Sequence, residues 1–413
     1  MSHIKQPFKP NNKTFNNTMK PQNTLPTPTK SAIEHSQLLS TQLCKAINRH
    51  GTLSFAQFMQ KTLYTPGLGY YANGLPKIGQ TGDFVTAPEI SALFSRCLAR
   101  QAAQVLPTLK EANILEFGAG QGTMAKDILL ELSALQQSID HYYILELSAD
   151  LRARQHTTLK NALPDALFNK IVWLDQLPQT KICAVVLANE VLDAMPFERI
   201  RIEPEQALQG FVKFNPDKNK FTWDYQKITT KPLQQFANQL IEHIGKVSDL
   251  GYETEINLNI APWLKSINDF LHQGIVLLID YGYTRQEYYQ PARVMGTLRC
   301  HYQHRAHSNP FFYPGLQDIT AHVDFTAVAE AAYDAGLKVT GYTTQAHFLM
   351  GSGLLEMSLD ADAPMTEQLK MAQQMKTLTL PNEMGETFKV MALSKHLDMT
   401  LIGFNMRDLR HQL

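Results

Sequence analysis

The feature that most constrains this chain is a glycine-rich turn between a short apolar run and a run with helical spacing. Residues 112–117 are largely apolar and include one acid, Glu116. Glycines then follow at alternate positions: Gly118, Gly120 and Gly122. An apolar run bounded by glycines is typical of a buried strand in a parallel sheet. Because residues 123–135 have helical spacing, the stretch predicts the strand, turn and helix of a nucleotide-binding βαβ unit.

The spacing of these glycines distinguishes between two ligands. A dinucleotide fingerprint is G-x-G-x-x-G, with the pyrophosphate at the helix N-terminus. Here Gly122 comes one residue early, and Thr123 stands where the third glycine is expected. The Glu116 carboxylate would repel a pyrophosphate but attract the amino group of S-adenosylmethionine, which carries no phosphate. An ordinary strand-to-helix turn is the alternative. The predicted contacts with S-adenosylmethionine in this turn are Glu116, Gly118, Gly120, Gly122 and Thr123.

The composition narrows the class of protein. The chain has 413 residues, of which 44% are hydrophobic and 18% charged, so it can form a large globular core. Its formal net charge is +0, and no overall field attracts nucleic acid or an anionic membrane surface. No apolar run approaches the length of a membrane span. The four cysteines lie far apart without a C-x-x-C pair, so we expect a reducing compartment and no zinc site.

Composition and periodicity divide the chain into segments. Residues 1–35 are rich in Asn, Thr, Pro and Lys, and we expect a disordered polar tail there. Residues 36–110 predict an N-terminal helical segment, and residues 111–413 predict the main domain. Within that domain, aromatic and polar residues alternate over 197–260, which predicts an inserted antiparallel lobe. The tail lacks both a secretory apolar region and the arginines of a mitochondrial presequence, so a bacterial cytoplasmic protein is favoured over a mitochondrial one.

A helix start is predicted shortly before the sheet. Thr86 and Glu89 have the spacing of a capping box, with Thr86 at the N-cap of a helix that runs to about Leu106. The turn-rich residues 82–86 are suited to folding over a ligand, and an ordinary loop and cap is an equal alternative. Thr86 and Pro88 are therefore candidate cofactor contacts.

Acids follow two further predicted strands. Residues 142–147 predict the second strand, and Glu146 near its end can accept hydrogen bonds from both ribose hydroxyls of a nucleoside. Leu147 beside it is a further candidate contact. Residues 171–174 predict the third strand, and Asp175 after it is a candidate partner of the adenine amino group. For each acid the alternative is a solvated carboxylate at a strand end.

The fourth predicted strand ends in a polar group. Residues 183–188 are apolar, and Asn189, Glu190 and Asp193 follow them. Because ligands of open α/β sheets lie beyond the carboxyl ends of the strands, these side chains are expected near the reacting atoms. We predict a cofactor contact for Asn189 and catalytic roles for Glu190 and Asp193, with helix capping as the alternative.

The long segment 283–324 contributes a further catalytic candidate. It has little periodicity and predicts a loop that covers the substrate, because loops of this length inside a compact domain are usually functional. His322 could accept the proton that a methylated nitrogen releases, with packing inside the loop as the alternative. Asp318, His322 and Asp324 could suggest a metal site, but no second acid–histidine group lies nearby and no metal is predicted.

Several stretches together resemble the MidA-like family of S-adenosylmethionine-dependent methyltransferases. They are residues 82–90, 116–122, 146–148, 189–194, 280–282 and 318–325. The resemblance extends from about Leu38 to the C-terminus. It implies an α/β fold with a Rossmann-like, seven-stranded methyltransferase sheet and S-adenosylmethionine as the cofactor. For mitochondrial members it implies assistance in the assembly of respiratory complex I, through symmetric dimethylation of an arginine on a peripheral-arm subunit.

The leading hypothesis is a protein methyltransferase that acts on an arginine side chain of a protein substrate. Glu190 and Asp193 would hold the planar guanidinium through paired hydrogen bonds and localise its charge away from the attacking nitrogen. Two alternatives stay open. One is a non-catalytic assembly factor that binds S-adenosylmethionine, and the other, less favoured, is an NAD-dependent oxidoreductase. The sequence does not predict an oligomeric state.

Overall fold

The structure is a computed structural model that describes residues 25–74, 86–245, 251–357 and 364–413. The predicted disordered tail therefore lies largely outside the described residues. Helix α1 (Lys30–His50) begins at Lys30 rather than at the predicted residue 36. Thr29 caps it, because its hydroxyl accepts a hydrogen bond from the backbone N–H of Ala32 at 3.3 Å.

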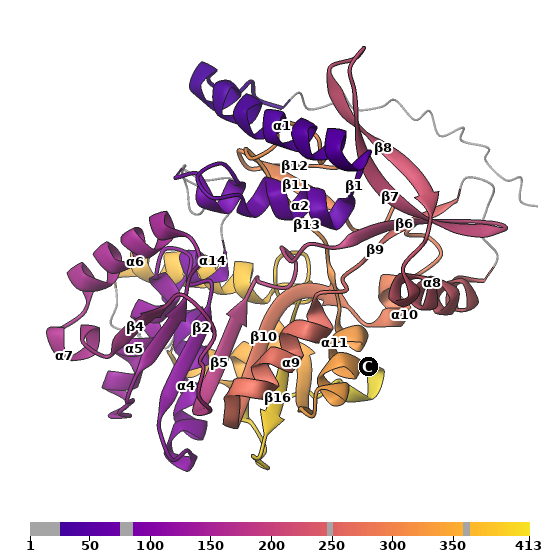
Figure 1. Cartoon of the computed structure of the whole chain (residues 1–413). Helices are drawn as coiled ribbons and strands as arrows, with labels where there is room; N and C mark the ends of the chain where they lie inside the picture. The colour runs from indigo at the N-terminus through magenta and orange to yellow at the C-terminus, as the bar shows by residue number, and fades with distance from the viewer. Residues whose placement is uncertain (1–24, 75–85, 246–250, 358–363) are drawn as a thin grey trace, which may run out of the picture.

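A mixed sheet forms the centre of the fold (Figure 1). Its main strands lie in the order β15-β16-β10-β5-β2-β3-β4; β16 runs antiparallel to both neighbours, and the other pairs are parallel. Their bounds are β2 Asn113–Phe117, β3 Tyr142–Leu145, β4 Ile171–Leu174, β5 Ile182–Asn189, β10 Leu271–Tyr283, β15 Lys338–Thr344 and β16 Phe388–Lys395. This arrangement confirms the predicted Rossmann-like α/β sheet of seven strands.

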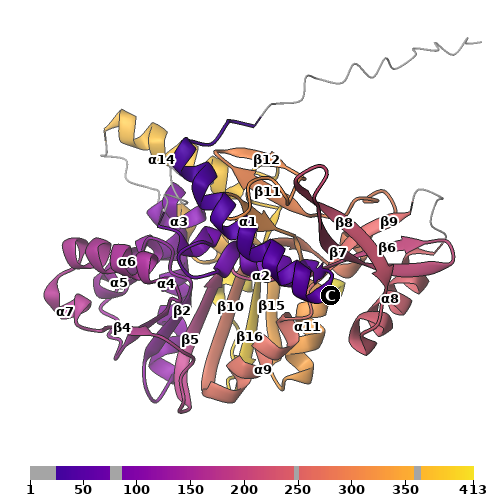
Figure 2. The same cartoon turned by 45° about the horizontal axis from the view of Figure 1, so that its top comes forward.

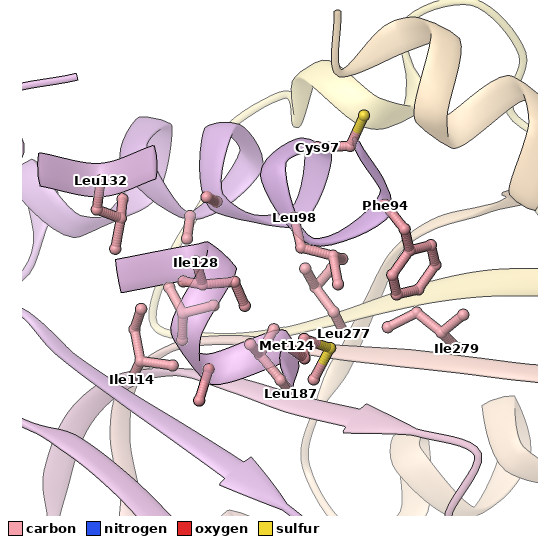
Figure 3. Close-up of a cluster of buried hydrophobic side chains, with 14 of the residues drawn as sticks. Phe94, Cys97, Leu98, Ile114, Met124, Ile128, Leu132, Leu187, Leu277 and Ile279 are labelled. Atoms are coloured by element: carbon pink, nitrogen blue, oxygen red, sulfur yellow. The ribbon is translucent and has the colours of Figure 1, made fainter. Parts of the chain in front are cut away.

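Helices cover both faces of this sheet (Figure 1). Their bounds are α4 Ala92–Val105, α5 Thr123–Ala134, α6 Ala149–Ala162, α7 Asp165–Phe168, α9 Ile260–Phe270, α11 Phe325–Asp334, α12 Gln345–Gly351, α13 Leu354–Met357 and α14 Met365–Thr379. Ile114 of β2 packs with Leu187 of β5 and Ile128 of α5 in one core (Figure 3). Leu115 packs in a second core with α9 and α11. Because successive side chains of a strand point to opposite faces, strands covered on both faces are continuous apolar runs in the sequence.

A second layer lies over the carboxyl-end edge of the sheet (Figures 1 and 2). It contains α1, α2 (Phe55–Tyr64), α8 (Lys231–Ile244) and an antiparallel sheet. The strands of that sheet are β1 Leu53–Ser54, β6 Glu198–Glu203, β7 Gln206–Asn215, β8 Lys220–Lys227 and β9 Tyr252–Ile256. The ring centre of Phe55 lies 5.4 Å from that of Phe197 and 4.8 Å from that of Trp223. The N-terminal segment predicted over 36–110 is thus divided, because α1 and α2 pack on the inserted lobe and α4 packs on the main sheet.

The segment predicted as a long loop over 283–324 contains regular structure, so that part of the prediction is wrong. Its elements are α10 Arg285–Tyr288, β11 Arg299–Tyr302, β12 Arg305–His307, β13 Asp318–Thr320 and β14 Val323–Asp324. Strands β12, β11 and β13 form a small antiparallel sheet. These strands are too short to show a period of two, and positive φ angles at Gln303 and His304 make the tight turn without a glycine.

The predicted capping box at Thr86 does not form. Thr86 occupies the N-cap of α3 (Ala87–Ile90) but its side chain makes no capping hydrogen bond. Helix α3 ends at Ile90, and the Ser91 hydroxyl caps α4 by accepting from the backbone N–H of Leu93 at 3.3 Å. Residues 82–85 of the predicted covering loop lie outside the described residues.

Neither a membrane helix nor a metal cluster is found in the part of the chain that the structure describes. No helix there is long and apolar enough to cross a membrane. No three His, Cys, Asp or Glu side chains gather there to hold a metal ion. Asp324, from the trio considered in the sequence, caps α11 by accepting from the backbone N–H of Ala327 at 3.1 Å.

Candidate active site

A cavity of about 760 Å³ lies between the main sheet and the layer above it. Residues that follow β2, β3 and β5 line one side, and α2, the short helix η1 (Tyr70–Ala72), β11 and β13 line the other. The strand order reverses between β2 and β5, where open α/β sheets bind their ligands. The predicted site residues that line this cavity are Thr86, Pro88, Glu116, Gly118, Gly120, Thr123, Glu146, Leu147, Asn189, Glu190, Asp193 and His322.

The glycine turn between β2 and α5 requires left-handed backbone angles. The φ angle is +63° at Gly118, +53° at Gly120 and +86° at Gly122, a region that residues with a Cβ rarely adopt. Gly118 and Gly120 line the cavity, as predicted for residues that let a ligand approach the backbone. Gly122 does not line it and instead permits helix packing, because a Cβ there would lie 3.3 Å from Cγ of Leu159 in α6.

Glu116 is buried at the end of β2, where its carboxylate faces a single phenol. The Tyr142 hydroxyl donates to Oε2 of Glu116 at 2.7 Å. Burial raises the pKa of Glu116 to about 7, although the hydrogen bond from Tyr142 lowers it. A cationic amino group beside this carboxylate would favour its ionised form, so the site suits an α-amino ligand better than a phosphate.

Glu116→Gln is expected to weaken binding of S-adenosyl-homocysteine about ten-fold, or ~1.4 kcal/mol, in calorimetry. The amide keeps the shape and can still accept from Tyr142, but it loses the charge that would face the amino group. Tyr142→Phe is the matched control, since it removes the hydrogen bond and keeps the charge, and its effect should be smaller. Wild-type affinity in Glu116→Gln would mean that the amino group binds elsewhere.

Glu146 is held at the end of β3 by a side chain that the sequence analysis missed. Its two carboxylate oxygens accept from the backbone N–H of Ser148 at 2.8 Å and from Nε2 of Gln155 at 3.0 Å. The same Nε2 donates to the carbonyl oxygen of Gly120 at 3.0 Å. Gln155 therefore ties the glycine turn to the predicted ribose-binding acid. A glutamine in the middle of a helix carries no sequence signal for this role.

Asp175 does not line the large cavity. Its side chain is 84% exposed and forms an ion pair with Arg152. It lies instead in an adjacent hollow of about 600 Å³ that Glu146 and Leu147 also line. The structure therefore brings Asp175 together with Glu146 and Leu147 but not with the candidates that line only the large cavity, and its contact with adenine stays a prediction.

The turn after β5 brings the predicted catalytic acids to the cavity. Glu190 has a φ angle of +52°, and its backbone N–H donates to the carbonyl oxygen of Ile279 at 2.9 Å. The Tyr281 hydroxyl donates to Oδ2 of Asp193, whereas Oδ1 of Asp193 is buried and has no hydrogen-bond partner among the described residues. Burial, together with the nearby Asp193, raises the pKa of Glu190 to about 8. Burial likewise raises the pKa of Asp193 to about 6.

Asp280, in the neighbouring strand β10, fixes the turn after β5. Its Oδ2 accepts from the backbone N–H groups of Leu192 at 3.0 Å and Asp193 at 3.2 Å, and its Oδ1 accepts from that of Tyr281 at 2.9 Å. The Asp280 side chain is fully buried, which raises its pKa. It is a positioning residue, since it acts on the backbone that carries Asp193.

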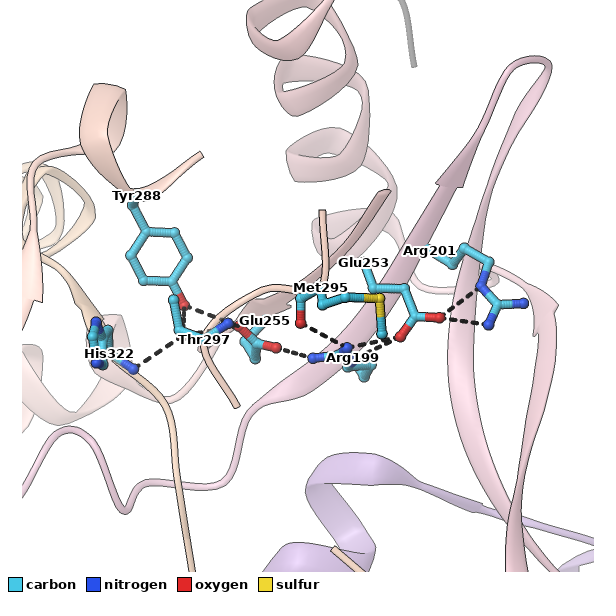
Figure 4. Close-up of polar contacts among 8 residues, drawn as sticks. All are labelled: Arg199, Arg201, Glu253, Glu255, Tyr288, Met295, Thr297 and His322. Carbon is cyan, nitrogen blue, oxygen red and sulfur yellow. Dashed lines mark hydrogen bonds and ion pairs between the residues drawn. The ribbon is translucent and has the colours of Figure 1, made fainter. Parts of the chain in front are cut away.

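His322 is held through a polar network that begins in the inserted lobe (Figure 4). Arg199 pairs with Glu255, whose Oε2 accepts from the Thr297 backbone N–H at 2.7 Å and from its hydroxyl at 2.9 Å. The Thr297 hydroxyl oxygen then accepts from the backbone N–H of His322 at 3.1 Å. The imidazole lies between two tyrosine rings, and burial lowers the pKa of His322 to about 4. His322 is therefore neutral at pH 7 and a weak base.

Thr297→Val is expected to lower the thermal midpoint of unfolding. Valine has the same shape but leaves the His322 N–H and one interaction of buried Glu255 unsatisfied, and such a loss costs about 1–3 kcal/mol. Thr297→Ser keeps the hydroxyl and should remain near wild type in the same scan. Equal midpoints for the valine and serine variants would contradict the network.

The opposite wall of the cavity carries polar aromatic residues that the sequence analysis did not identify. The Tyr64 hydroxyl donates to the carbonyl oxygen of Ala194 at 2.8 Å. The Tyr71 hydroxyl donates to Oδ1 of Asp318 at 2.9 Å. The two tyrosine rings stack with their centres 5.5 Å apart. Helix α2 and η1 thus link the turn after β5 to strand β13 across the cavity.

An acid, a glycine turn and further acids beyond parallel strands, on a sheet with one antiparallel strand, define a nucleoside-binding methyltransferase site. Residues 97–343 match a family described as "Putative S-adenosyl-L-methionine-dependent methyltransferase". Because the match covers more than half of the 413 residues, the chain belongs to this family. The predicted cofactor, S-adenosylmethionine, is confirmed at the level of the family, and the family match gives no support to the NAD-dependent alternative.

Two kinds of relative are similar over most of the chain. A crystal structure of a Burkholderia thailandensis protein bound to S-adenosyl-homocysteine has 38% sequence identity and a TM-score of 0.88, covering 94% of this chain and 100% of that one. The human "Protein arginine methyltransferase NDUFAF7, mitochondrial" is 26% identical over 382 residues, 85% of this chain and 82% of that protein. Its Drosophila melanogaster homologue is 26% identical over 402 residues, 89% of this chain and 88% of that protein. These relatives confirm the MidA-like resemblance.

The residues of the cavity fit S-adenosylmethionine. Gly118 and Gly120 let a ligand lie against the backbone. The Glu116 and Glu146 carboxylates are acceptors, which suits an amino group and ribose hydroxyls and does not suit phosphate.

Proposed function

We propose that this protein is an S-adenosylmethionine-dependent protein N-methyltransferase that acts on an arginine side chain. The observation that carries the proposal is the pair of acids, half-buried Glu190 and buried Asp193, in the same cavity as the glycine turn. Two relatives whose names state protein arginine methyltransferase activity support the choice of arginine. The Burkholderia thailandensis relative bound to S-adenosyl-homocysteine supports the cofactor site.

Methyl transfer to arginine makes two demands on the protein. S-adenosylmethionine supplies a methyl group that leaves its sulfonium and joins an arginine nitrogen, with release of S-adenosyl-homocysteine and one proton. A guanidinium stays protonated at neutral pH because its pKa exceeds about 12, so it is a poor nucleophile. The protein must therefore orient the guanidinium and accept the proton as the new bond forms.

The acids after β5 can meet both demands. Carboxylates bind a guanidinium through paired, charge-assisted hydrogen bonds, and Oδ1 of Asp193 has no hydrogen-bond partner in the described part of the chain. The pKa of Glu190 is raised to about 8 without a ligand, and a bound guanidinium would favour its ionised form. That carboxylate, a stronger base than an ordinary one, could then accept the released proton, so we assign the proton to Glu190. His322 stays a predicted proton acceptor, although its pKa of about 4 disfavours it.

The proposal also includes the cellular location of the protein and the identity of its protein substrate. A bacterial origin is supported by the bacterial source of the Burkholderia thailandensis relative, and a cytoplasmic location stays a prediction. A subunit of a respiratory complex I-type enzyme is the candidate substrate by the MidA-like resemblance. A non-catalytic role in assembly is the competing function, and it differs from the proposal in predicting cofactor binding without methyl transfer.

Two measurements test the function. In calorimetry, S-adenosyl-homocysteine should bind in the micromolar to millimolar range typical of metabolites, and NAD should not bind. Methyl-labelled S-adenosylmethionine should then transfer label to a protein in a bacterial lysate. Binding without any label transfer would favour the assembly factor, and tight NAD binding without a response to S-adenosyl-homocysteine would contradict the cofactor site.

A further inference from the structure

A third acid faces the same cavity from the wall opposite Glu190 and Asp193. Asp318 lies in β13 of the small antiparallel sheet, and only 3% of it is exposed. Its Oδ1 accepts from the Tyr71 hydroxyl and from the backbone N–H of Ile319, each at 2.9 Å. The carboxylate is therefore held in one orientation at the cavity wall.

Acidic side chains outnumber basic ones in the lining of the cavity, and a bound cation would favour their ionised forms. Among the described residues, six carboxyl side chains line it: Glu89, Glu116, Glu146, Glu190, Asp193 and Asp318. The single guanidinium among the lining residues described is that of Arg299. Low-dielectric walls lined by one sign of charge attract ligands of the opposite sign. The cavity therefore favours a cationic substrate over a neutral or anionic one.

A separate observation indicates that a ligand donates a hydrogen bond to one of these acids. Asp193 is 6% exposed, and its Oδ1 has no hydrogen-bond partner among the residues that the structure describes. Across the cavity, Tyr64 and Tyr71 stack with ring centres 5.5 Å apart. Burial keeps both phenols neutral by raising their pKa values, and the nearby Asp318 raises them further. A buried carboxylate oxygen without a donor, beside aromatic rings, is suited to a planar cation with several N–H groups.

We propose that Asp318, held by Tyr71, is a specificity residue that binds the substrate guanidinium from the side opposite Glu190 and Asp193. This inference rests on the proposed arginine methyltransferase function and adds a binding residue from the second layer. Glu190 and Asp193, which follow β5 of the main sheet, would orient the guanidinium. Asp318 would bind its remaining N–H groups. A neutral side chain of the same shape would bring fewer N–H groups and no positive charge to these acids.

The test measures binding of a small probe rather than catalysis. N-acetyl-arginine methylamide and its neutral isostere, N-acetyl-citrulline methylamide, are titrated into the full chain saturated with S-adenosyl-homocysteine and followed by saturation-transfer NMR. The arginine amide should bind at millimolar concentration, and the citrulline amide should not. Asp318→Asn should weaken binding of the arginine amide at least ten-fold and leave the affinity for S-adenosyl-homocysteine unchanged, which also shows that the variant is folded.

Two further variants separate a direct contact from a structural one. Asp398→Asn removes an equal charge from an exposed pair with Lys338 and should bind the arginine amide as wild type does. Tyr71→Phe removes the partner of Asp318 and keeps its charge, so it should weaken binding less than Asp318→Asn. Equal losses in Tyr71→Phe and Asp318→Asn would mean that Asp318 only positions Tyr71, and would overturn the inference.

The outcomes for the two proposals are distinguishable. Wild-type binding of the arginine amide by Asp318→Asn, or no binding by the wild type itself, overturns the role of Asp318 even if arginine methylation is found. Label transfer to another type of residue overturns the proposed function. A selective, Asp318-dependent response to the arginine amide would still support the cation-binding role in that case.

Discussion

Gly120→Val should abolish measurable binding of S-adenosyl-homocysteine and leave the protein folded. The φ angle of Gly120 is +53°, where a residue with a Cβ costs about 1–2 kcal/mol and a β-branched one is a clear outlier. The residue also lines the cavity, and its carbonyl oxygen accepts from Gln155 of α6. A side chain there meets the ligand or moves the turn, and either change should cost at least about 100-fold in affinity, or ~2.7 kcal/mol.

Gly51→Val is the matched control for this experiment. Gly51 has a φ angle of +82°, and a Cβ there would meet no atom within 4 Å. It ends α1, far from the glycine turn in the chain, so the variant carries similar backbone strain without an effect on the cavity. Calorimetry should show wild-type affinity for Gly51→Val and no binding for Gly120→Val. If Gly120→Val binds S-adenosyl-homocysteine like the wild type, the cofactor site is elsewhere.

Glu190→Gln should retain cofactor binding within about three-fold and lose at least about 100-fold in methyl transfer, equivalent to ~2.7 kcal/mol of transition-state stabilisation. The amide can still donate or accept one hydrogen bond, but it can neither accept the proton nor oppose the guanidinium charge. The rate is measured as label transferred to a lysate protein at saturating S-adenosylmethionine. A wild-type rate in Glu190→Gln would remove the acid pair from the mechanism.

Glu190→Gln should also be more stable than the wild type at high pH but not at low pH. The pKa of Glu190 is raised from 4.5 to about 8 in the fold, so between these values the folded protein holds a proton that the unfolded chain releases. Stability conferred by this group therefore falls as the pH rises from about 5 to about 8. The thermal midpoint of ligand-free Glu190→Gln should equal or fall below that of the wild type at pH 5 and exceed it at pH 8.5. An offset that is the same at both pH values would contradict the protonated state of Glu190 in the folded protein.

The sequence predicted those parts of the site that follow the ends of parallel strands. The acids Glu116, Glu146 and Glu190 come from three strands, yet they line one cavity because the carboxyl ends of parallel strands meet at the same edge. The glycine turn was also predictable, because left-handed backbone angles such as those at Gly118 and Gly120 strongly favour glycine, and glycines are visible in the sequence. Local signals of this kind do not depend on contacts between distant segments.

The rest of the site depends on contacts between segments far apart in the sequence. Tyr71 meets Asp318 across 247 positions of the chain, and Tyr64 meets Ala194 across 130. No periodicity or motif marks such pairs. The small sheet that carries Asp318 was predicted as a loop, because strands of three or four residues show no clear alternation.

Two residues that were predicted to contact the cofactor do not line the large cavity, and contacts between distant segments are again the reason. Gly122 has the glycine spacing of a ligand turn, but its missing side chain makes room for Leu159 of α6. Asp175 follows a strand like the other acids, yet its side chain turns to Arg152 at the surface. In both cases the packing or pairing of α6, which no local pattern predicts, decides what the residue contacts.

The most direct test of the central claim is identification of the residue that receives the methyl group. Wild-type protein and Glu190→Gln are incubated with methyl-labelled S-adenosylmethionine and bacterial lysate, and the labelled protein is digested and analysed by mass spectrometry. The account predicts a methyl group on the guanidinium of an arginine with the wild type, and almost none with Glu190→Gln. A methyl group on any other type of residue, or equal labelling by both proteins, would contradict it.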